Sequence, residues 1–326
     1  EQTEQIQRRT TLLPWIIVIV LTLLLVVLGI KHFSSSTDRS LITATIQPPE
    51  RMNFYLFGNN AGPTVLSSDG KRLAFVAADS MGKRFLYIRS LDGSVAKRLD
   101  GTEGALYPFW SPDNQFVGFF TQGRLKKIDA SGGAPIAICN AVPTRGGTWN
   151  AAGMIVFAGS ATPLLVVPAS GGTAAVLTKF DSLRKENSHR WPSFLPDGRH
   201  LLYMARTATG GSQSEGGLIC IASLDGKVNK ILVPASSNAV FASGYILYVR
   251  GTTLVAHVFD EGSMELKGEP TAIAEGVTYD PSTNRGMFTV SSNQILVYQT
   301  GEAQSGSRLV MHDRAGKPTG VATKLS

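Results

Sequence analysis

The chain has 326 residues, of which 43% are hydrophobic and 17% are charged, and its net charge is +7. This length and apolar content suffice for one large closed domain, and the 34 glycines indicate that turns outnumber helices. Lysines and arginines are scattered and often adjoin acidic residues, whereas a nucleic-acid site needs a clustered basic face. We therefore expect a mixed, solvated surface and no nucleic-acid partner.

Residues 12–30 form an uncharged apolar stretch, in which Thr22 is the one residue with a polar side chain. At a rise of about 1.5 Å per residue, a helix of this length matches the hydrocarbon core of a bilayer. Pro14 falls in the first turn, where proline is tolerated, and Trp15 lies where an interfacial aromatic anchor belongs. We expect a single transmembrane helix. The alternative, a signal sequence, is disfavoured because no small-residue cleavage site follows the stretch.

Short polar segments flank this apolar stretch. Arg8 and Arg9 precede it and one lysine follows it closely, so the charge bias slightly favours a cytoplasmic N-terminal side. We expect residues 1–11 to be a cytoplasmic juxtamembrane segment and residues 31–41 a polar tether. The protein is then a single-pass protein of the cell inner membrane, with its larger part periplasmic or extracellular. Because the first residue is Glu, we also expect the chain to be cut from a longer polypeptide.

Residues 107–133 contain the clearest copy of a repeated unit. A run ending in Trp110 meets the turn-forming sequence Ser-Pro-Asp-Asn, and two further apolar segments follow, with turns at Gly123 and Gly132. Short strands separated by turns predict an antiparallel meander. The aromatic residue that ends the second strand recurs at intervals of about 40 to 50 residues, as Phe75, Phe119, Phe157, Tyr203, Tyr248 and Tyr298.

A period of this length, with four short strands in each unit, is typical of propeller blades. Each sheet has two apolar faces that must pack on its neighbours, so six units can close a ring. We predict an all-β fold, a six-bladed β-propeller at residues 42–326 that follows the transmembrane helix. A first strand within residues 42–62 and the segment 308–324 are expected to complete the last blade. The predicted blades are residues 63–100, 101–142, 143–180, 181–234, 235–275 and 276–326.

The turns Ser-Pro-Asp-Asn at residues 111–114 and Leu-Pro-Asp-Gly at 195–198, with the Ser-Gly-Gly closures, resemble the WD40-like repeats of TolB-type propellers. The segments GTEGALYPFWSPDNQFVGFF, RLKKIDASGGAP, RGGTWNAAGMIVF and SHRWPSFLPDGRHLLYMAR are similar to the C-terminal half of membrane-anchored bacterial serine/threonine protein kinases. The resemblance implies a sensory or binding propeller outside the cytoplasm and a kinase domain upstream in the same chain. No kinase motif occurs in these residues, so no kinase residue is carried over.

Three aspartates, Asp69, Asp113 and Asp197, occupy corresponding turns of the repeat. We expect each side chain to cap local backbone groups, because whole blades separate the three and keep them from acting as an acid and base pair. The sequence contains neither a nucleophile elbow nor a metal-ligand spacing. We therefore expect no catalytic residue, no metal and no cofactor.

Polar, cationic and aromatic residues precede the innermost strand of successive units. The innermost strands of a propeller line its central channel, so these side chains are expected at the channel mouth. Convergent cations there suit an unknown protein partner or a small anionic ligand. The alternative is that the arginines bond carbonyls and carboxylates of adjacent blades, and that the histidine satisfies a neighbouring blade. The candidate binding residues are Tyr107, Arg145, His189, Arg190, Asn238 and Arg285.

These expectations together predict a non-catalytic, membrane-attached binding or sensor region of a protein kinase. One alternative is an envelope protein-interaction platform of the TolB type without a signalling role. Another is a propeller attached to a membrane-bound transcriptional regulator. A propeller lactonase with a metal in its channel is disfavoured, because it needs convergent acidic residues that the channel positions lack.

Overall fold

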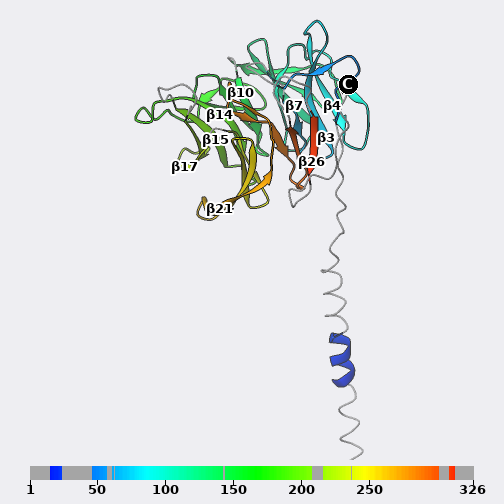
Figure 1. Cartoon of the computed structure of the whole chain (residues 1–326), viewed down its shortest axis with the longest axis vertical. Coiled ribbons are helices and arrows are strands. Elements are labelled where there is room, and N and C mark those ends of the chain that lie inside the picture. The colour runs from blue at the N-terminus through cyan, green and yellow to red at the C-terminus, as the bar shows by residue number, and fades with distance from the viewer. Residues whose placement is uncertain are drawn as a thin grey trace, which may run out of the picture. The chain divides into compact units, whose positions relative to one another are not determined.

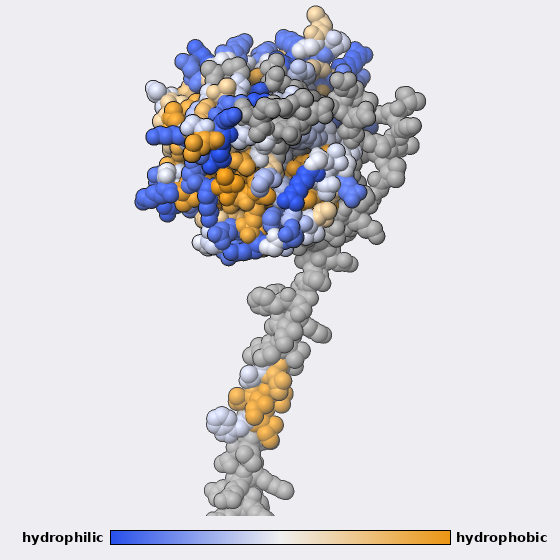
Figure 2. Space-filling model, turned by 60° about the vertical axis from the view of Figure 1, so that its left-hand side comes forward, coloured by the Kyte–Doolittle hydropathy of each residue, from blue (hydrophilic) through white to orange (hydrophobic). Residues whose placement is uncertain are grey.

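The computed structural model describes residues 15–23, 46–56, 61, 63–141, 144–207, 216–235, 237–300 and 308–312. The chain divides into two compact units, residues 1–41 and 42–326. In the first unit, residues 15–23 form a helix whose apolar side chains, such as those of Ile16 and Ile19, are exposed (orange in Figure 2). No helix in the described part of the chain has the length and apolar content to cross a membrane. Much of the predicted span 12–30 lies outside the described residues.

The second unit is built from antiparallel strands, and five of its sheets have four or more strands (Figure 1). The first sheet contains β1 (Asn53–Phe54), β2 (Val65–Leu66), β3 (Arg72–Ala78), β4 (Arg84–Ser90) and β5 (Ala96–Arg98). The second contains β6 (Leu106–Trp110), β7 (Phe116–Thr121), β8 (Arg124–Asp129) and β9 (Ile136–Asn140). The third contains β10 (Thr144–Trp149), β11 (Met154–Gly159), β12 (Leu164–Pro168) and β13 (Ala175–Val176).

The remaining strands follow in the same way. The fourth sheet contains β14 (Glu186–Phe194), β15 (His200–Thr207), β16 (Gly217–Ser223) and β17 (Asn229–Pro234). The fifth contains β18 (Ala239–Ala242), β19 (Tyr245–Arg250), β20 (Thr253–Asp260) and β21 (Glu265–Ala274). A two-stranded ribbon, β22 (Tyr279–Asp280) and β23 (Arg285–Gly286), comes next, followed by a three-stranded sheet, β24 (Phe288–Val290), β25 (Leu296–Thr300) and β26 (Arg308–His312).

The sheets form a closed ring around their inner strands, which are β2, β6, β10, β14, β18 and β24. Each inner strand contacts the inner strand of the next sheet, and β24 contacts β2. Figure 1 shows the last strands, orange to red, beside the first sheet. The Leu66 N–H donates to Thr289 Oγ1 at 3.1 Å, and the Asn293 side-chain amide donates to the Asp69 carbonyl at 3.0 Å. These bonds join the two ends of the ring, so the propeller prediction is confirmed.

Two details of that prediction were wrong. The described residues form five complete blades and not six, because the last position of the ring holds the three-stranded sheet β24–β26. The first strand of the domain also does not complete the last blade. Instead β1 pairs with β3, with Asn53 opposite Ala78, and so extends the first sheet. The ring is therefore closed by side chains and turns between its first and last sheets, since no strand is shared between them in the described residues.

The core lies between neighbouring sheets, where the second strands carry short apolar runs covered on both faces. The six aromatic residues named as the repeat marker lie inside these runs and not at their ends, since buried residues such as Val76 and Met204 follow them, and each is at most 2% exposed. Burying one such side chain contributes about 1.5–3 kcal/mol to folding. The repeated aromatic residue is therefore a packing element, as its period predicted.

The turn aspartates have the structural role expected of them. Ser111 Oγ donates to Asp113 Oδ1, the Gln115 N–H donates to the same oxygen at 3.0 Å, and the Phe116 N–H donates to Ser111 Oγ. Equivalent bonds surround Asp69, and two backbone N–H groups donate to Asp197. A carboxylate used in this way fixes the hairpin locally.

Candidate functional site

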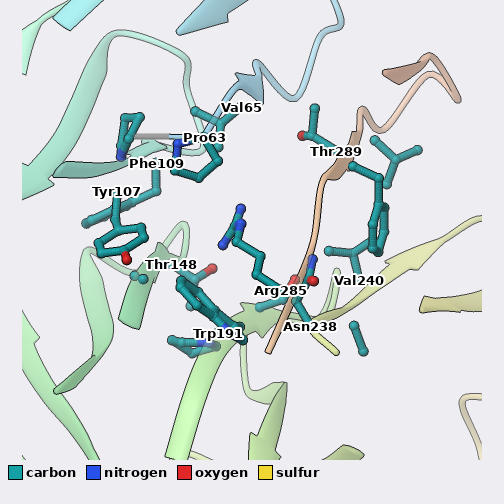
Figure 3. Close-up of a pocket in the computed structure, with 18 residues that line it drawn as sticks. Pro63, Val65, Tyr107, Phe109, Thr148, Trp191, Asn238, Val240, Arg285 and Thr289 are labelled. Carbon is teal, nitrogen blue, oxygen red and sulfur yellow. The ribbon is translucent and has the colours of Figure 1, made fainter. Parts of the chain in front are cut away.

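The inner strands enclose a cavity of about 150 Å³ on the axis of the ring (Figure 3). Each of the six inner strands contributes to its wall, and the ribbon strand β23 contributes Arg285. Proline, aromatic and small residues make up most of the lining. Representative wall residues, one from each ring position or its flank, are Val65, Tyr107, Thr148, Trp191, Asn238 and Thr289.

The wall depends on a bulge that recurs in three consecutive inner strands. Register shifts occur between Leu106 and Phe109 in β6, within the Thr144–Trp149 strand, and within Glu186–Phe194. At these places Tyr107, Gly146 and Trp191 have φ angles of 44°, 85° and 54°. Bulky residues seldom adopt positive φ, and a bulge redirects the side chain that it carries. The bulges thus present two aromatic rings to the cavity.

Glycine is required where these rings pack. A Cβ built on Gly146 would lie 2.9 Å from Trp191 Cε3, and one on Gly147 would lie 2.6 Å from Phe109 Cε1. Either approach is too close for any residue with a side chain. The paired glycines of β10 therefore provide the space that lets the rings of Phe109 and Trp191 form adjacent parts of the wall.

Arg285 is the charged group of the cavity. Its guanidinium carbon lies 4.6 Å from the centroid of the Trp191 ring, and Figure 3 shows the head group directed toward the space beside Tyr107 and Thr148. The residue is half-buried, its Nε is buried without a hydrogen-bond partner, and its side chain makes no hydrogen bond to any described residue. Burial lowers the pKa of Arg285 to about 10, while Tyr107 and Asp280 act in the opposite direction.

Tyr107 packs across the cavity from Arg285. Its ring meets the Trp191 ring edge to face, with centroids 5.3 Å apart, and its backbone N–H donates to the Ala61 carbonyl. Burial raises the pKa of the Tyr107 phenol, although Arg145 and Arg285 favour its ionised form. The phenol therefore stays protonated at neutral pH and keeps a hydroxyl near the cationic group.

The other arginines and the asparagine have structural partners. Arg190 donates to the Thr283 carbonyl at 3.1 Å and to Asn284 Oδ1 at 2.9 Å, both in the turn of the β22–β23 ribbon. Asn238 Oδ1 accepts the Gly286 N–H at 2.8 Å. Arg145 is buried and donates to the Thr144 carbonyl. For these residues the structural alternative fits better, since Arg190 and Asn238 fix the ribbon that carries Arg285 and Arg145 bonds within its own strand; Asn238 also lines the cavity.

His189 lies apart from the cavity, in the interface between the third and fourth sheets. It is fully buried, with Nδ1 2.7 Å from Thr178 Oγ1 and Nε2 3.1 Å from Glu186 Oε2. Burial lowers the pKa of His189, and the neighbouring Glu186 acts against this shift. The imidazole satisfies a neighbouring blade, as the alternative expected. The described residues contain no group of histidine, cysteine and carboxylate side chains that could hold a metal ion.

Of the predicted residues, Tyr107, Asn238 and Arg285 line the cavity, and so does Trp191, which was not predicted. The two residues before Trp191 were predicted in its place, because the spacing of a regular strand gives no means of locating a bulge. A signal does exist. An aromatic residue followed by proline occurs as Tyr107-Pro108 and again as Trp191-Pro192, at equivalent places in the second and fourth repeats.

No protein-family model matches this chain. A curated relative, the uncharacterized peptidase YuxL of Bacillus subtilis (strain 168), is 28% identical over 141 residues, which are 43% of this chain and 21% of the relative. The match thus spans about a fifth of that protein. Because this relative carries the name of a peptidase, the expectation of a non-catalytic chain stays a prediction.

Many solved structures are similar to this chain, among them the following two. TolB from Acinetobacter baumannii matches with a TM-score of 0.55 and 18% identity, over 76% of this chain and 65% of that one. A gluconolactonase from Xanthomonas campestris matches with a TM-score of 0.50 and 13% identity, over 84% of this chain and 88% of that one. Identities this low show the fold alone, and the kinase context stays a prediction. This chain therefore has a TolB-like β-propeller fold.

Proposed function

We propose that this propeller is a binding module whose channel cavity receives the anionic group of a ligand or partner, with Arg285 as the anchor. The observation that carries the proposal is a half-buried guanidinium that is directed into a cavity and makes no hydrogen bond to a described residue. A guanidinium offers five N–H donors in a planar fork that matches carboxylate oxygens. Desolvating such a group without a partner is costly, and an entering anion would offset that cost.

The test is calorimetric titration of the purified chain with propionate, which is small enough for a cavity of about 150 Å³. Wild type is expected to bind saturably and Arg285→Gln is expected to lose at least 90% of the binding heat. The matched control is Arg98→Gln, which removes an exposed arginine that pairs with Asp100 and lies outside the cavity. Equal heats for wild type and Arg285→Gln would overturn the proposal, as would the absence of binding by propionate and inorganic phosphate alike.

The wider role that we propose is that of a non-catalytic sensor region of a membrane-anchored serine/threonine protein kinase. The support is the sequence resemblance, together with the apolar stretch 12–30, which we propose as a single membrane span with the propeller on the outer side. Binding in the channel would then change the proximity of the spans and the output of the upstream domain. Deleting residues 42–326 from the full reading frame and measuring autophosphorylation tests this role, and an unchanged output would rule it out.

A second candidate is an envelope interaction platform without signalling. The observation that favours it is the similarity of the fold to TolB, which at 18% identity supports the architecture and not the partners. Affinity purification of the tagged chain from envelope fractions would recover a stable complex in this case. An upstream reading frame that contains no kinase domain would favour this candidate over the sensor.

A further inference from the structure

A wider space adjoins the cavity. This space, which we call the funnel, has a volume of about 800 Å³, and it shares the wall residues Thr148 and Val290 with the cavity. It lies among the hairpin turns that follow the inner strands. Its lining includes Pro112, Trp149, Ala152, Phe194, Pro196 and Phe241.

Three consecutive sheets each contribute an aromatic ring to the wall of the funnel. Trp149 and Phe194 are the last residues of β10 and β14, and Phe241 is the next-to-last residue of β18. All three rings are half-buried, so each packs against its own sheet and leaves part of its surface open to the funnel. Among the described lining residues, only Asp197 and Arg199 carry charge.

The two volumes indicate how a ligand would be divided between them. Ligand sites usually enclose about 300–1,000 Å³. The cavity is too small by this measure, whereas the funnel falls within the range. A ligand would therefore place only an acidic end group beside Arg285 and would hold its apolar remainder against the aromatic rings of the funnel.

The funnel wall also indicates what kind of molecule that remainder is. The hydroxyl groups of half-buried Ser68 and exposed Ser292 lie in the same wall as the aromatic and proline surfaces. A peptide has the matching composition, because backbone amides that need partners alternate with apolar side chains. An alkyl chain has no group that would use these hydroxyls.

We infer that the funnel and cavity together bind the carboxyl-terminal segment of a partner polypeptide, with its terminal carboxylate on Arg285 and apolar side chains on Trp149, Phe194 and Phe241. This inference rests on the proposed function, because it names the partner of the same arginine. Capture of a terminal carboxylate is a recurring mode of peptide recognition, and an arginine fork suits it.

The experiment uses fluorescent six-residue peptides ending in Leu-Phe-Val, one with a free carboxylate and one amidated, titrated into the purified chain. We expect wild type to bind the free acid at least tenfold more tightly than the amide, and Arg285→Gln to bind both equally weakly. Ala152→Trp, at an exposed turn residue of the funnel, is expected to weaken the acid peptide about tenfold while leaving propionate binding unchanged. Arg98→Gln is the control and is expected to behave as wild type.

Each other outcome has a definite meaning. Wild type that binds propionate but neither peptide would overturn this inference and leave the proposed function standing. Equal affinity for acid and amide peptides would also overturn it, since an internal segment would then suffice. Tighter binding of dodecanoate than of the acid peptide, weakened by Ala152→Trp, would assign the funnel to a lipid. Wild type that binds no probe at all would refute the proposed function together with the inference.

Discussion

The guanidinium carbon of Arg285 lies 4.6 Å from the centroid of the Trp191 ring. The two residues come from different sheets, β23 and β14, and this contact attracts the arginine to the cavity wall, together with the electrostatic attraction of Tyr107 and Asp280. Stacking on an indole contributes about 0.5–2 kcal/mol, which is less than the cost of removing a cation from water. The arginine is therefore kept at a net cost to folding, as is common for groups that serve binding.

This balance predicts that Arg285→Met stabilises the chain while it abolishes propionate binding. The pKa of Arg285 is lowered to about 10 by burial, from an ordinary value of 12.5. Because the folded-state pKa is the lower one, the charged side chain costs stability at every pH below about 10, and this cost fades as the pH rises through the interval to 12.5. We expect a gain of about 1–2 kcal/mol at pH 7, measured as a raised urea midpoint. A lower midpoint would show that stacking outweighs desolvation.

The repeat architecture could be predicted because its signals are local. A Ser-Pro-Asp-Asn turn, a short apolar run and an aromatic residue within that run each act within a few residues, and their recurrence indicates a ring of sheets. The completeness of the ring could not be predicted in this way. Whether a sheet gains a fourth strand depends on pairing across its free edge, and the pairing of β1 with β3 has no marker in the sequence.

The candidate site was predicted only in part, because side-chain direction in a strand depends on register. Two positions separate His189 from Trp191, and a bulge lies just beyond Arg190. As a result, the His189 side chain lies in the interface between two sheets, whereas the Trp191 side chain lines the cavity. Arg190 and Arg285 look equivalent in the sequence, yet one is bound to the Thr283 carbonyl and the other is free of such bonds among the described residues.

The glycines around Phe109 provide a second prediction. A Cβ on Gly118 would lie 2.4 Å from Phe109 Cζ, and a Cβ on Gly147 would approach the same ring from the neighbouring sheet. We expect Gly118→Ala and Gly147→Ala each to lower the free energy of unfolding by about 1–3 kcal/mol, because Phe109 must shift within a packed wall. Urea denaturation would measure the loss. Gly93→Ala is the control, since its Cβ would meet Ser90 at an ordinary 3.8 Å. Two alanine variants as stable as the control would contradict the packing argument.

The burial of His189 predicts that the stability of the fold depends on pH near neutrality. Its pKa is lowered by burial, and a neutral ring protonated at Nε2 would donate to Glu186 and accept from the Thr178 hydroxyl. Because the unfolded chain takes up a proton at a higher pH than the folded chain, stability falls as the pH drops below about 6.5.

The check compares the urea midpoints of wild type and His189→Gln at pH 7.5 and pH 5.5. The other four histidines of the chain are present in both proteins, so any contribution from them cancels in the difference. We expect wild type to lose on the order of 1 kcal/mol more than the variant over this interval. Propionate binding should be unchanged in the variant, since His189 lies outside the cavity. Identical pH profiles would show that the ring does not titrate in this window.

The turn carboxylates predict a separate loss of stability in acid. The hydrogen bond from Ser223 Oγ, aided by the Lys227 N–H, lowers the pKa of Asp225 to about 2. The hydrogen bond from Ser111 Oγ likewise lowers the pKa of Asp113 below its ordinary value. A depressed carboxyl pKa contributes stability that is complete above the unfolded value of about 4 and disappears as the pH falls toward the folded value.

The chain itself contains the matched control for this effect. In the last sheet Asn293 stands where the first, second and fourth sheets have aspartate in the turn after the inner strand, and Ser291 Oγ donates to its Oδ1 as Ser223 Oγ does to Asp225. Asp225→Asn should therefore keep the turn and reduce the loss of stability between pH 4 and pH 2, whereas Asp225→Ala should lower stability already at pH 7. Urea midpoints at pH 7, 4 and 2 would separate the two variants. If Asp225→Asn lost as much stability in acid as wild type, the carboxylate would not be the titrating group.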